Sequence, residues 1–221
     1  MKMRIVMIDS NFKYIVYPNL PQEYIEQLKD IAQSAIPEGI LGDNSIIDYS
    51  EYPQMFKCYG GPFDINGASF ECRYLITKPN SGKFVTHTDG GRSYGLNIPI
   101  QVDFLKGYFL VYNGEDHSDD TYPELGNSIK PFDRELPPEI RAMFNAQTDE
   151  ELYRSNSIGR FWWPHPKITL FKKVTLNRPL LINAKLPHTF VNYGDTFRVI
   201  ASLRPTTNSD DELFEALAPF I

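Results

Sequence analysis

The sequence predicts a mainly β protein, a sandwich or barrel of short strands with helices packed on the outside. Apolar and polar residues alternate with period two in several segments, and turn-forming residues separate these segments. The 221 residues include 15 Phe, 13 Tyr and 17 Pro, a composition that favours strands and loops over a helical bundle. Many short strands at this spacing are typical of a sandwich or barrel.

The clearest strand is the segment 69–77, which reads SFECRYLIT. Every second residue contributes to one apolar face, formed by Phe70, Cys72, Tyr74 and Ile76. Further strands are predicted at 83–89, 94–102, 104–112, 168–175, 179–184, 187–193 and 197–204.

Two helices are predicted to flank the strands, at 21–35 and 209–218. Apolar residues in the first recur at the three-to-four spacing of one buried helix face. Ser209 and Glu212 have the spacing of a capping box and open the second helix. The segment 36–68 is rich in Gly, Pro, Asn and Asp, and we expect it to be mostly loop.

We expect residues 1–221 to form one domain, with core strands in 69–112 and 166–204. The intervening segment 113–165 is polar and poor in strand patterns, and two short helices are predicted near its end. Loops this long inside a compact domain are usually functional. We therefore interpret 113–165 as an insertion and a candidate lid over a site.

Charge and cysteine content narrow the functional classes. The 22 basic and 28 acidic residues give a net charge of −6, which disfavours a general nucleic-acid binder. The first residues carry charged and polar breaks, so they predict neither a secretory signal nor a membrane span. Two Cys cannot form a disulfide framework. These features predict a cytoplasmic protein without membrane association, and they leave its oligomeric state open.

Three residues have the types and spacing of a metal site. His87 and Asp89 form an HTD motif at the end of a predicted strand, where residues two apart project to the same face. His188 lies in a later strand. Two imidazoles and one carboxylate on one face of Fe(II) leave positions open for O₂ and a co-substrate. The alternative is a surface turn pair beside Gly90-Gly91 and a hydrogen-bonded core histidine.

Arg198 is the candidate anion-binding residue. The turn-forming residues after Asn192 predict a hairpin between the last two strands. A three-residue loop would pair Asn192 with Arg198 and His188 with Ser202, all on one face, whereas a two-residue loop would put Arg198 on the opposite face. We expect the three-residue loop. A guanidinium placed there could bind a carboxylate through two hydrogen bonds, or it could form a structural salt bridge.

The runs HTDGGRSYGLNIPI and LINAKLPHTFVNYGDTFRVIASL resemble the Fe(II)- and 2-oxoglutarate-dependent dioxygenases. The nearest branches are the aspartyl/asparaginyl β-hydroxylase-like and prolyl-hydroxylase-like proteins. The resemblance covers about 70–204 and implies a double-stranded β-helix, or jelly roll. It implies Fe(II) ligation by His87, Asp89 and His188, and a contact between Arg198 and the distal carboxylate of 2-oxoglutarate.

The resemblance also implies an activity, in which O₂ and 2-oxoglutarate are consumed to hydroxylate a C–H bond, with release of succinate and CO₂. The substrate would be a protein or peptide side chain or a small molecule. Many family members carry Arg-x-Ser, but Ile200 stands at the serine position here. We therefore expect Ser202 or Tyr74 to supply that hydroxyl group to the co-substrate.

Four further residues are weaker candidates for ligand contacts. Asn97 could hydrogen-bond the co-substrate or satisfy a strand edge, and Arg92 could contact an anionic substrate or cap its loop. Trp162 and Trp163 could stack on a substrate, although aromatic pairs more often pack in a core. Two other classes of protein remain open: a cupin-like metal protein that uses no 2-oxoglutarate, and a jelly-roll recognition module with structural histidines.

Overall fold

A computed structural model provides the structure of the protein. The described residues are 16–42, 52–53, 55–83, 86–87, 94–113, 161–162, 169–184, 186, 188–207 and 209–221. Most of the segment 113–165 therefore lies outside the described residues, and the predicted lid and the short helices within it stay predictions.

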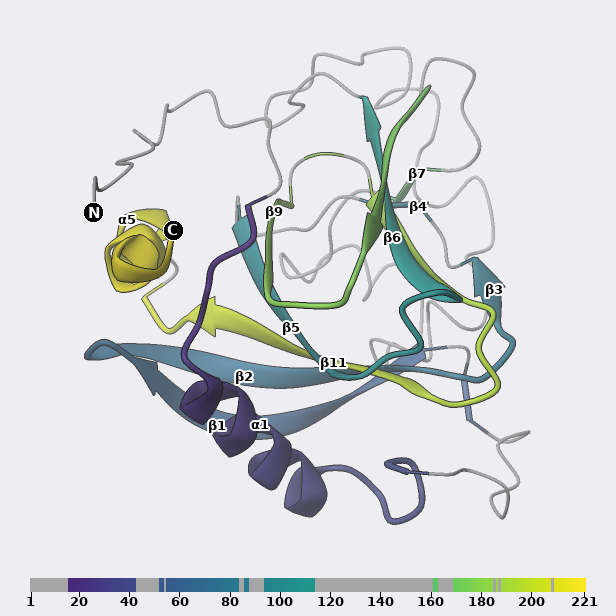
Figure 1. Cartoon of the computed structure of the whole chain (residues 1–221), viewed down its shortest axis with the longest axis horizontal. Helices are drawn as coiled ribbons and strands as arrows, with labels where there is room; N and C mark the ends of the chain where they lie inside the picture. Colours follow the sequence, from purple (N-terminus) through teal and green to yellow (C-terminus); the bar gives the residue numbers. More distant parts are fainter. Residues whose placement is uncertain are drawn as a thin grey trace, which may run out of the picture.

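Two antiparallel sheets form a jelly-roll sandwich (Figure 1). Sheet A has the order β1-β2-β11-β5-β9, with β1 at Met55–Ile65, β2 at Ala68–Thr77, β11 at Arg198–Pro205, β5 at Tyr94–Gln101 and β9 at Leu180–Asn183. Sheet B has the order β7-β4-β10-β6-β8, with β7 at Phe161–Trp162, β4 at Thr86–His87, β10 at His188–Asn192, β6 at Gly107–Asn113 and β8 at Thr169–Thr175. The short strand β3, Gly82–Lys83, also pairs with β10.

The chain passes repeatedly from one sheet to the other. From β2 onward it visits sheet A at β5, β9 and β11 and sheet B at β4, β6, β8 and β10. This wrapping of a folded-over ribbon is the jelly-roll topology. The predicted fold class, mainly β with flanking helices, is confirmed.

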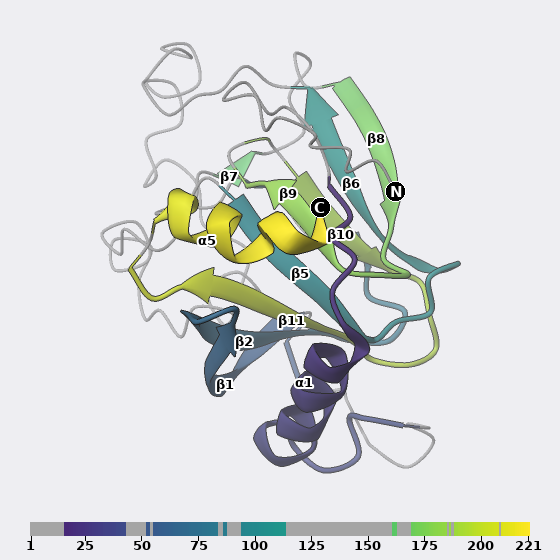
Figure 2. The same cartoon turned by 60° about the vertical axis from the view of Figure 1, so that its left-hand side comes forward.

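The helices cover the outer face of sheet A. Helix α1, Gln22–Ala35, lies on the side of β1 and β2 away from β6, and α5, Asp210–Leu217, lies apart from α1 and packs against β11 and β2 (Figures 1 and 2). The Ser209 side chain accepts a hydrogen bond from the Glu212 backbone N–H at 3.3 Å, as the capping-box spacing predicts. A short 3-10 turn, η2 at Ala218–Phe220, follows α5.

The alternation along the strands assigns each residue to a face. On β2, the predicted apolar set is buried against the helices in one hydrophobic cluster: Phe70, Cys72, Tyr74 and Ile76. On β11 the corresponding outer residues are Val199, Ala201 and Leu203. The residues between them belong to the inner face of sheet A, which looks toward sheet B.

Two sequence-based expectations are wrong. Residues 55–65, expected to be loop, form the long edge strand β1. Its GGP run conceals the alternation because the register shifts between Tyr59 and Gly61, a bulge that an edge strand tolerates. The last two strands do not form a hairpin: β10 pairs within sheet B and β11 within sheet A, so 193–197 crosses between sheets.

Within the part of the chain that the structure describes, no helix has the length and hydropathy needed to cross a bilayer.

Candidate functional site

Arg198 is a buried cation in the interior of the sandwich. It begins β11, its side chain is 1% exposed, and its guanidinium carbon lies 4.9 Å from the centre of the Phe109 ring and 5.1 Å from that of Phe190. Both rings belong to sheet B, and Phe109 and Phe190 are directly paired. Arg198 therefore points from sheet A across the interior toward the inner face of sheet B.

The guanidinium group of Arg198 keeps unused hydrogen-bond donors. Among the described residues, its Nε and Nη2 atoms are buried and have no hydrogen-bond partner. Burial lowers the pKa of Arg198 to about 9, which leaves the group charged near neutral pH. The faces of the two rings offset part of the lost hydration through cation–π attraction. A buried, unpaired cation is costly, and an anion bound there would remove most of that cost.

Thr77 is a second candidate anion-binding residue beside Arg198, and the sequence did not reveal it. Thr77 lies directly opposite Arg198 in the β2–β11 ladder, so both residues stand on the inner face, with Cβ atoms roughly 5 Å apart. Its side chain is fully buried, and its Oγ1 atom has no hydrogen-bond partner among the described residues. The strand alternation alone could have indicated that the Thr77 side chain faces the interior. The sequence did not indicate which strand pairs with β2, so it could not place Thr77 beside Arg198.

The candidate metal ligands His87 and His188 occupy neighbouring strands of sheet B. His188 begins β10, and its backbone pairs with that of His87, which ends β4. The side chain of His188 lies on the same face as that of Phe190, the ring that contacts Arg198, because the two residues are separated by two positions.

Local contacts set the tautomer of His188. Its Nδ1 atom lies 2.8 Å from the Leu186 carbonyl oxygen, which can only accept a hydrogen bond, so the proton belongs on Nδ1. The lone pair then lies on Nε2, the form in which an imidazole binds a metal with its other nitrogen held by a backbone carbonyl. The His188 ring also packs edge-on against Phe109, with centroids 6.4 Å apart.

The crossing segment between β10 and β11 is held by Asn192. Its buried amide nitrogen donates to the carbonyl oxygens of Lys78 at 2.8 Å and Thr196 at 3.0 Å, while its side-chain oxygen accepts from the Gly194 N–H at 3.1 Å. These bonds fix the point at which the chain enters β11. Asn192 thereby positions Arg198, the first residue of that strand.

Gly107 leaves room for the stem of Arg198. A Cβ atom at Gly107 would lie 3.1 Å from the Asp103 carbonyl oxygen and 3.5 Å from the Arg198 Cδ atom. A side chain there would crowd the turn before β6. Because Gly107 has no side chain, the aliphatic part of the Arg198 side chain can lie close to sheet B.

Tyr74 does not reach Arg198, contrary to our expectation. It lies on the outer face of sheet A, where its fully buried hydroxyl group donates a 2.6 Å hydrogen bond to the Leu28 carbonyl oxygen in α1. Burial also raises the pKa of Tyr74, so the phenol remains protonated and serves as a structural donor. The alternation of residues 69–77 explains this position, because it puts Tyr74 on the same face as Phe70, Cys72 and Ile76.

Ser202 and Asn97 do lie inside the sandwich. They are paired with each other across β11 and β5 and are 5% and 2% exposed. Ser202 is four residues beyond Arg198, about 13 Å along the strand, whereas Thr77 is directly opposite Arg198. Thr77 is therefore better placed than Ser202 to supply the hydroxyl group beside the guanidinium.

Several candidate residues cannot be placed. Asp89, Arg92 and Trp163 lie outside the described residues. The backbone of Trp162 in β7 pairs with Thr86 in β4, beside His87. Among the described side chains, no group of three His, Cys, Asp or Glu residues is arranged to hold a metal ion; a complete triad would require Asp89.

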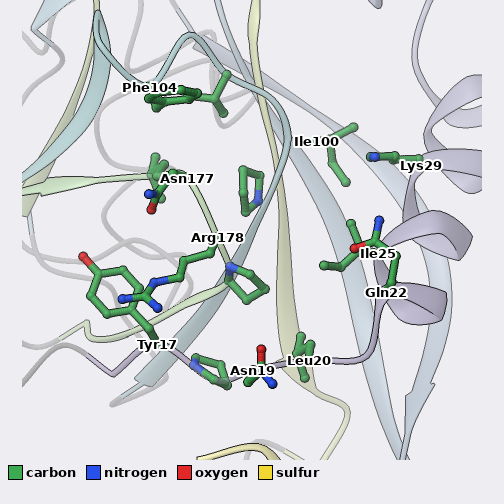
Figure 3. A pocket seen from close by; sticks show the side chains of 15 residues that line it. Tyr17, Asn19, Leu20, Gln22, Ile25, Lys29, Ile100, Phe104, Asn177 and Arg178 are labelled. Carbon is green, nitrogen blue, oxygen red and sulfur yellow. The ribbon is translucent and has the colours of Figure 1, made fainter.

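A separate cavity of about 440 Å³ lies outside the sandwich, between α1 and the turns that follow β5 and β8 (Figure 3). Arg178 at its rim lies over the Tyr17 ring, 4.2 Å from its centre, and Lys29 lines the opposite side. None of the predicted site residues that the structure describes lines this cavity. The candidate site is the sandwich interior around Arg198.

No protein-family model matches the chain, and no curated protein matches its sequence. Solved structures with a similar fold include the non-heme alpha ketoglutarate dependent epimerase SnoN from nogalamycin biosynthesis. The two are 13% identical, 86% of this chain and 76% of SnoN are covered, and the TM-score is 0.42. HygX from Streptomyces hygroscopicus with nickel and 2-oxoglutarate bound is 12% identical, with 86% and 80% covered and a TM-score of 0.38.

An oxalate oxidase in complex with the substrate analogue glycolate is 10% identical. The comparison covers 78% of this chain and 63% of the oxidase, with a TM-score of 0.33. At these identities and TM-scores the likeness concerns the fold and carries nothing about activity.

Proposed function

We propose that this protein is an Fe(II)- and 2-oxoglutarate-dependent oxygenase. The observation that carries the proposal is the buried pair of Arg198 and Thr77, whose unused donors face the interior of a jelly roll. The opposed pair of His87 and His188 in the facing sheet supports it. The resemblance of the HTDGG motif supplies the third ligand, Asp89.

The residues present fit the distal carboxylate of 2-oxoglutarate. The guanidinium fork, whose Nε and Nη2 atoms have no partner in the described part of the chain, matches the two oxygens of a carboxylate, and the Thr77 hydroxyl group can add a further donor. The surrounding rings of Phe109 and Phe190 exclude water, which strengthens these charge-assisted bonds. Arg198 and Thr77 would thus fix one end of an extended diacid.

The donor set also fits a 2-His-1-carboxylate iron site made of His87, His188 and Asp89. When bound, such a centre supplies the activation of O₂ that couples conversion of 2-oxoglutarate to succinate and CO₂ with oxidation of a C–H bond. Hydroxylation is the outcome that we propose, on a protein or peptide side chain or a small molecule.

The chain's own contribution is orientation and shielding. The Leu186 carbonyl oxygen holds the His188 ring in the metal-binding tautomer, and Asn192 holds the segment that delivers Arg198. Between Arg198 and Ser202, the inner face of β11 carries Ile200, which is paired with Leu75. These two apolar side chains separate Arg198 and Thr77, the anion clamp, from Ser202 and keep water away from the reacting atoms.

Calorimetric titration of the Mn(II)-loaded full chain with 2-oxoglutarate tests the proposal, together with succinate release in the presence of Fe(II) and O₂. We expect one binding site per chain that requires metal. Arg198→Ala should weaken 2-oxoglutarate binding by about 100-fold, because it removes a buried charged hydrogen-bonding partner. Asp89→Ala should abolish metal binding.

Tight metal binding without any 2-oxoglutarate binding would identify a cupin-like metal protein instead. The absence of a stoichiometric metal site would identify a non-enzymatic jelly-roll module. Either outcome contradicts the proposed function.

A further inference from the structure

The cavity outside the sandwich has the size of a small-molecule site. Its volume of about 440 Å³ lies within the range of about 300–1,000 Å³ that ligand pockets usually have. It lies between α1 and the turns that follow β5 and β8 (Figure 3). Apolar side chains form much of its wall, among them Leu20, Ile25, Pro99, Ile100, Leu176 and Pro179. Such a wall suits a ligand with an apolar body.

Tyr17, one of the lining residues, is held in place from both sides. The backbone of Val16 pairs with that of Leu181 in β9 through two N–H···O bonds of 3.0 and 2.8 Å. On the other side, the Asn19 N–H donates to the Phe220 carbonyl oxygen at 2.7 Å. The backbone around Tyr17 is therefore ordered before any ligand arrives, which lowers the entropic cost of binding.

Arg178 lies over the Tyr17 ring, with its guanidinium carbon 4.2 Å from the ring centre (Figure 3). A cation–π contact leaves the N–H donors of the guanidinium, which lie in its plane, available for hydrogen bonds. In the part of the chain that the structure describes, Arg178 has neither an ion pair nor a hydrogen bond. Tyr17 thus orients the group without neutralising its charge.

The other charges at the cavity leave Arg178 as the available cation. Lys29 lines the opposite wall, but its Nζ atom is paired with the Glu26 carboxylate at 3.1 Å. Among the described lining residues there is no Asp or Glu to compensate Arg178. A single guanidinium matches the two oxygens and the single negative charge of a carboxylate. A phosphate dianion would need a second available cation.

We propose that this cavity binds a small carboxylic acid with an apolar body, in its carboxylate form. Arg178 binds the carboxylate in the plane of its guanidinium group, and the apolar wall covers the body of the ligand. Because the Arg178 side chain is exposed, we expect a modest affinity, with a Kd of about 0.1–1 mM. The inference is independent of the proposed function, since the cavity shares no residue with the anion clamp.

Ligand-observed NMR on the full chain without added metal tests the inference, with benzoate and benzamide as a matched pair of probes. The two molecules have nearly the same shape, but benzoate alone carries a negative charge. We expect benzoate to bind about tenfold more tightly than benzamide. Phenyl phosphate should bind no more tightly than benzoate, because one cation is available. Tighter binding of phenyl phosphate would overturn the assignment to a carboxylate.

Substitutions locate the binding. Arg178→Gln should abolish the preference for benzoate over benzamide. Asn177→Lys adds a cation next to Arg178 and should strengthen the binding of phenyl phosphate about threefold, a gain that misfolding cannot produce. Lys173→Gln is the matched control, because Lys173 also lies over a tyrosine ring, that of Tyr108 at 3.8 Å, but does not line the cavity. We expect no change in this control.

Equal affinities of the wild-type chain for benzoate and benzamide would overturn the inference, as would a preference that survives in Arg178→Gln. Loss of benzoate binding in Arg198→Met but not in Arg178→Gln would place the probe in the anion clamp and would also overturn it. Failure of the chain to bind 2-oxoglutarate would remove the proposed function and leave this inference standing.

Discussion

His188 at the start of β10 lies directly opposite His87 at the end of β4, in antiparallel register. One hundred and one positions separate the two histidines in the chain, yet the ladder of sheet B pairs their backbones directly. Phe109 connects this face to the anion clamp, because its ring contacts both His188 and Arg198. The candidate metal ligand His188 and the candidate co-substrate clamp therefore line the same interior.

Thr77→Val should weaken the binding of 2-oxoglutarate without lowering the stability of the protein. The substitution keeps the shape of the side chain but removes a hydroxyl group that has no hydrogen-bond partner among the residues that the structure describes. We expect 2-oxoglutarate binding to weaken about tenfold, with the free energy of unfolding unchanged or raised by up to about 1 kcal/mol. Calorimetric titration and urea unfolding measure the two quantities. Wild-type affinity would show that another hydroxyl group serves the co-substrate.

Arg198→Met should stabilise the protein while it abolishes 2-oxoglutarate binding. Among the described residues the buried guanidinium has donors without a partner, and an apolar side chain of similar length avoids the cost of burying that charge. We expect a gain of about 1–4 kcal/mol, the range found when buried ion pairs are replaced by apolar residues. Thermal unfolding without ligand reports this change. A large loss of stability would mean that the contacts with Phe109 and Phe190 outweigh the cost of burying the charge.

Tyr74→Phe should affect stability alone. It removes the hydrogen bond to the Leu28 carbonyl oxygen, and we expect a loss of about 1 kcal/mol in the free energy of unfolding. The affinity for 2-oxoglutarate should not change, because the hydroxyl group lies on the outer face of sheet A. A weaker affinity at full metal occupancy would restore the role that the sequence suggested for Tyr74.

Asn192→Ala should loosen the crossing segment that carries Arg198. The amide satisfies the carbonyl oxygens of Lys78 and Thr196 and the N–H of Gly194, so its removal leaves buried backbone groups unpaired. We expect a loss of about 2–3 kcal/mol in stability and a weaker affinity for 2-oxoglutarate. Hydrogen exchange at residues 193–197 measures the loosening directly. Unchanged exchange there would contradict the positioning role of Asn192.

The local patterns of the sequence predicted much of this fold. The alternation in 69–77 identified β2 and its apolar face, and Ser209 with Glu212 marked the start of α5. These features depend on neighbours within a few residues, so the sequence contains them directly. The edge strand β1 was not predicted, because a bulge and a Gly-Gly-Pro run interrupt its alternation of polar and apolar residues.

The amino-acid sequence alone indicates which residue types are present, which segments alternate, and that His87 and His188 lie in strands. The assignment of β10 and β11 to different sheets, and the position of Thr77 rather than Tyr74 beside Arg198, become visible in the folded chain. A turn signal specifies that the chain changes direction, but the sheet that the next strand joins depends on contacts between residues far apart in the chain. Those contacts are set by burial of both sheet faces, and no local pattern encodes them.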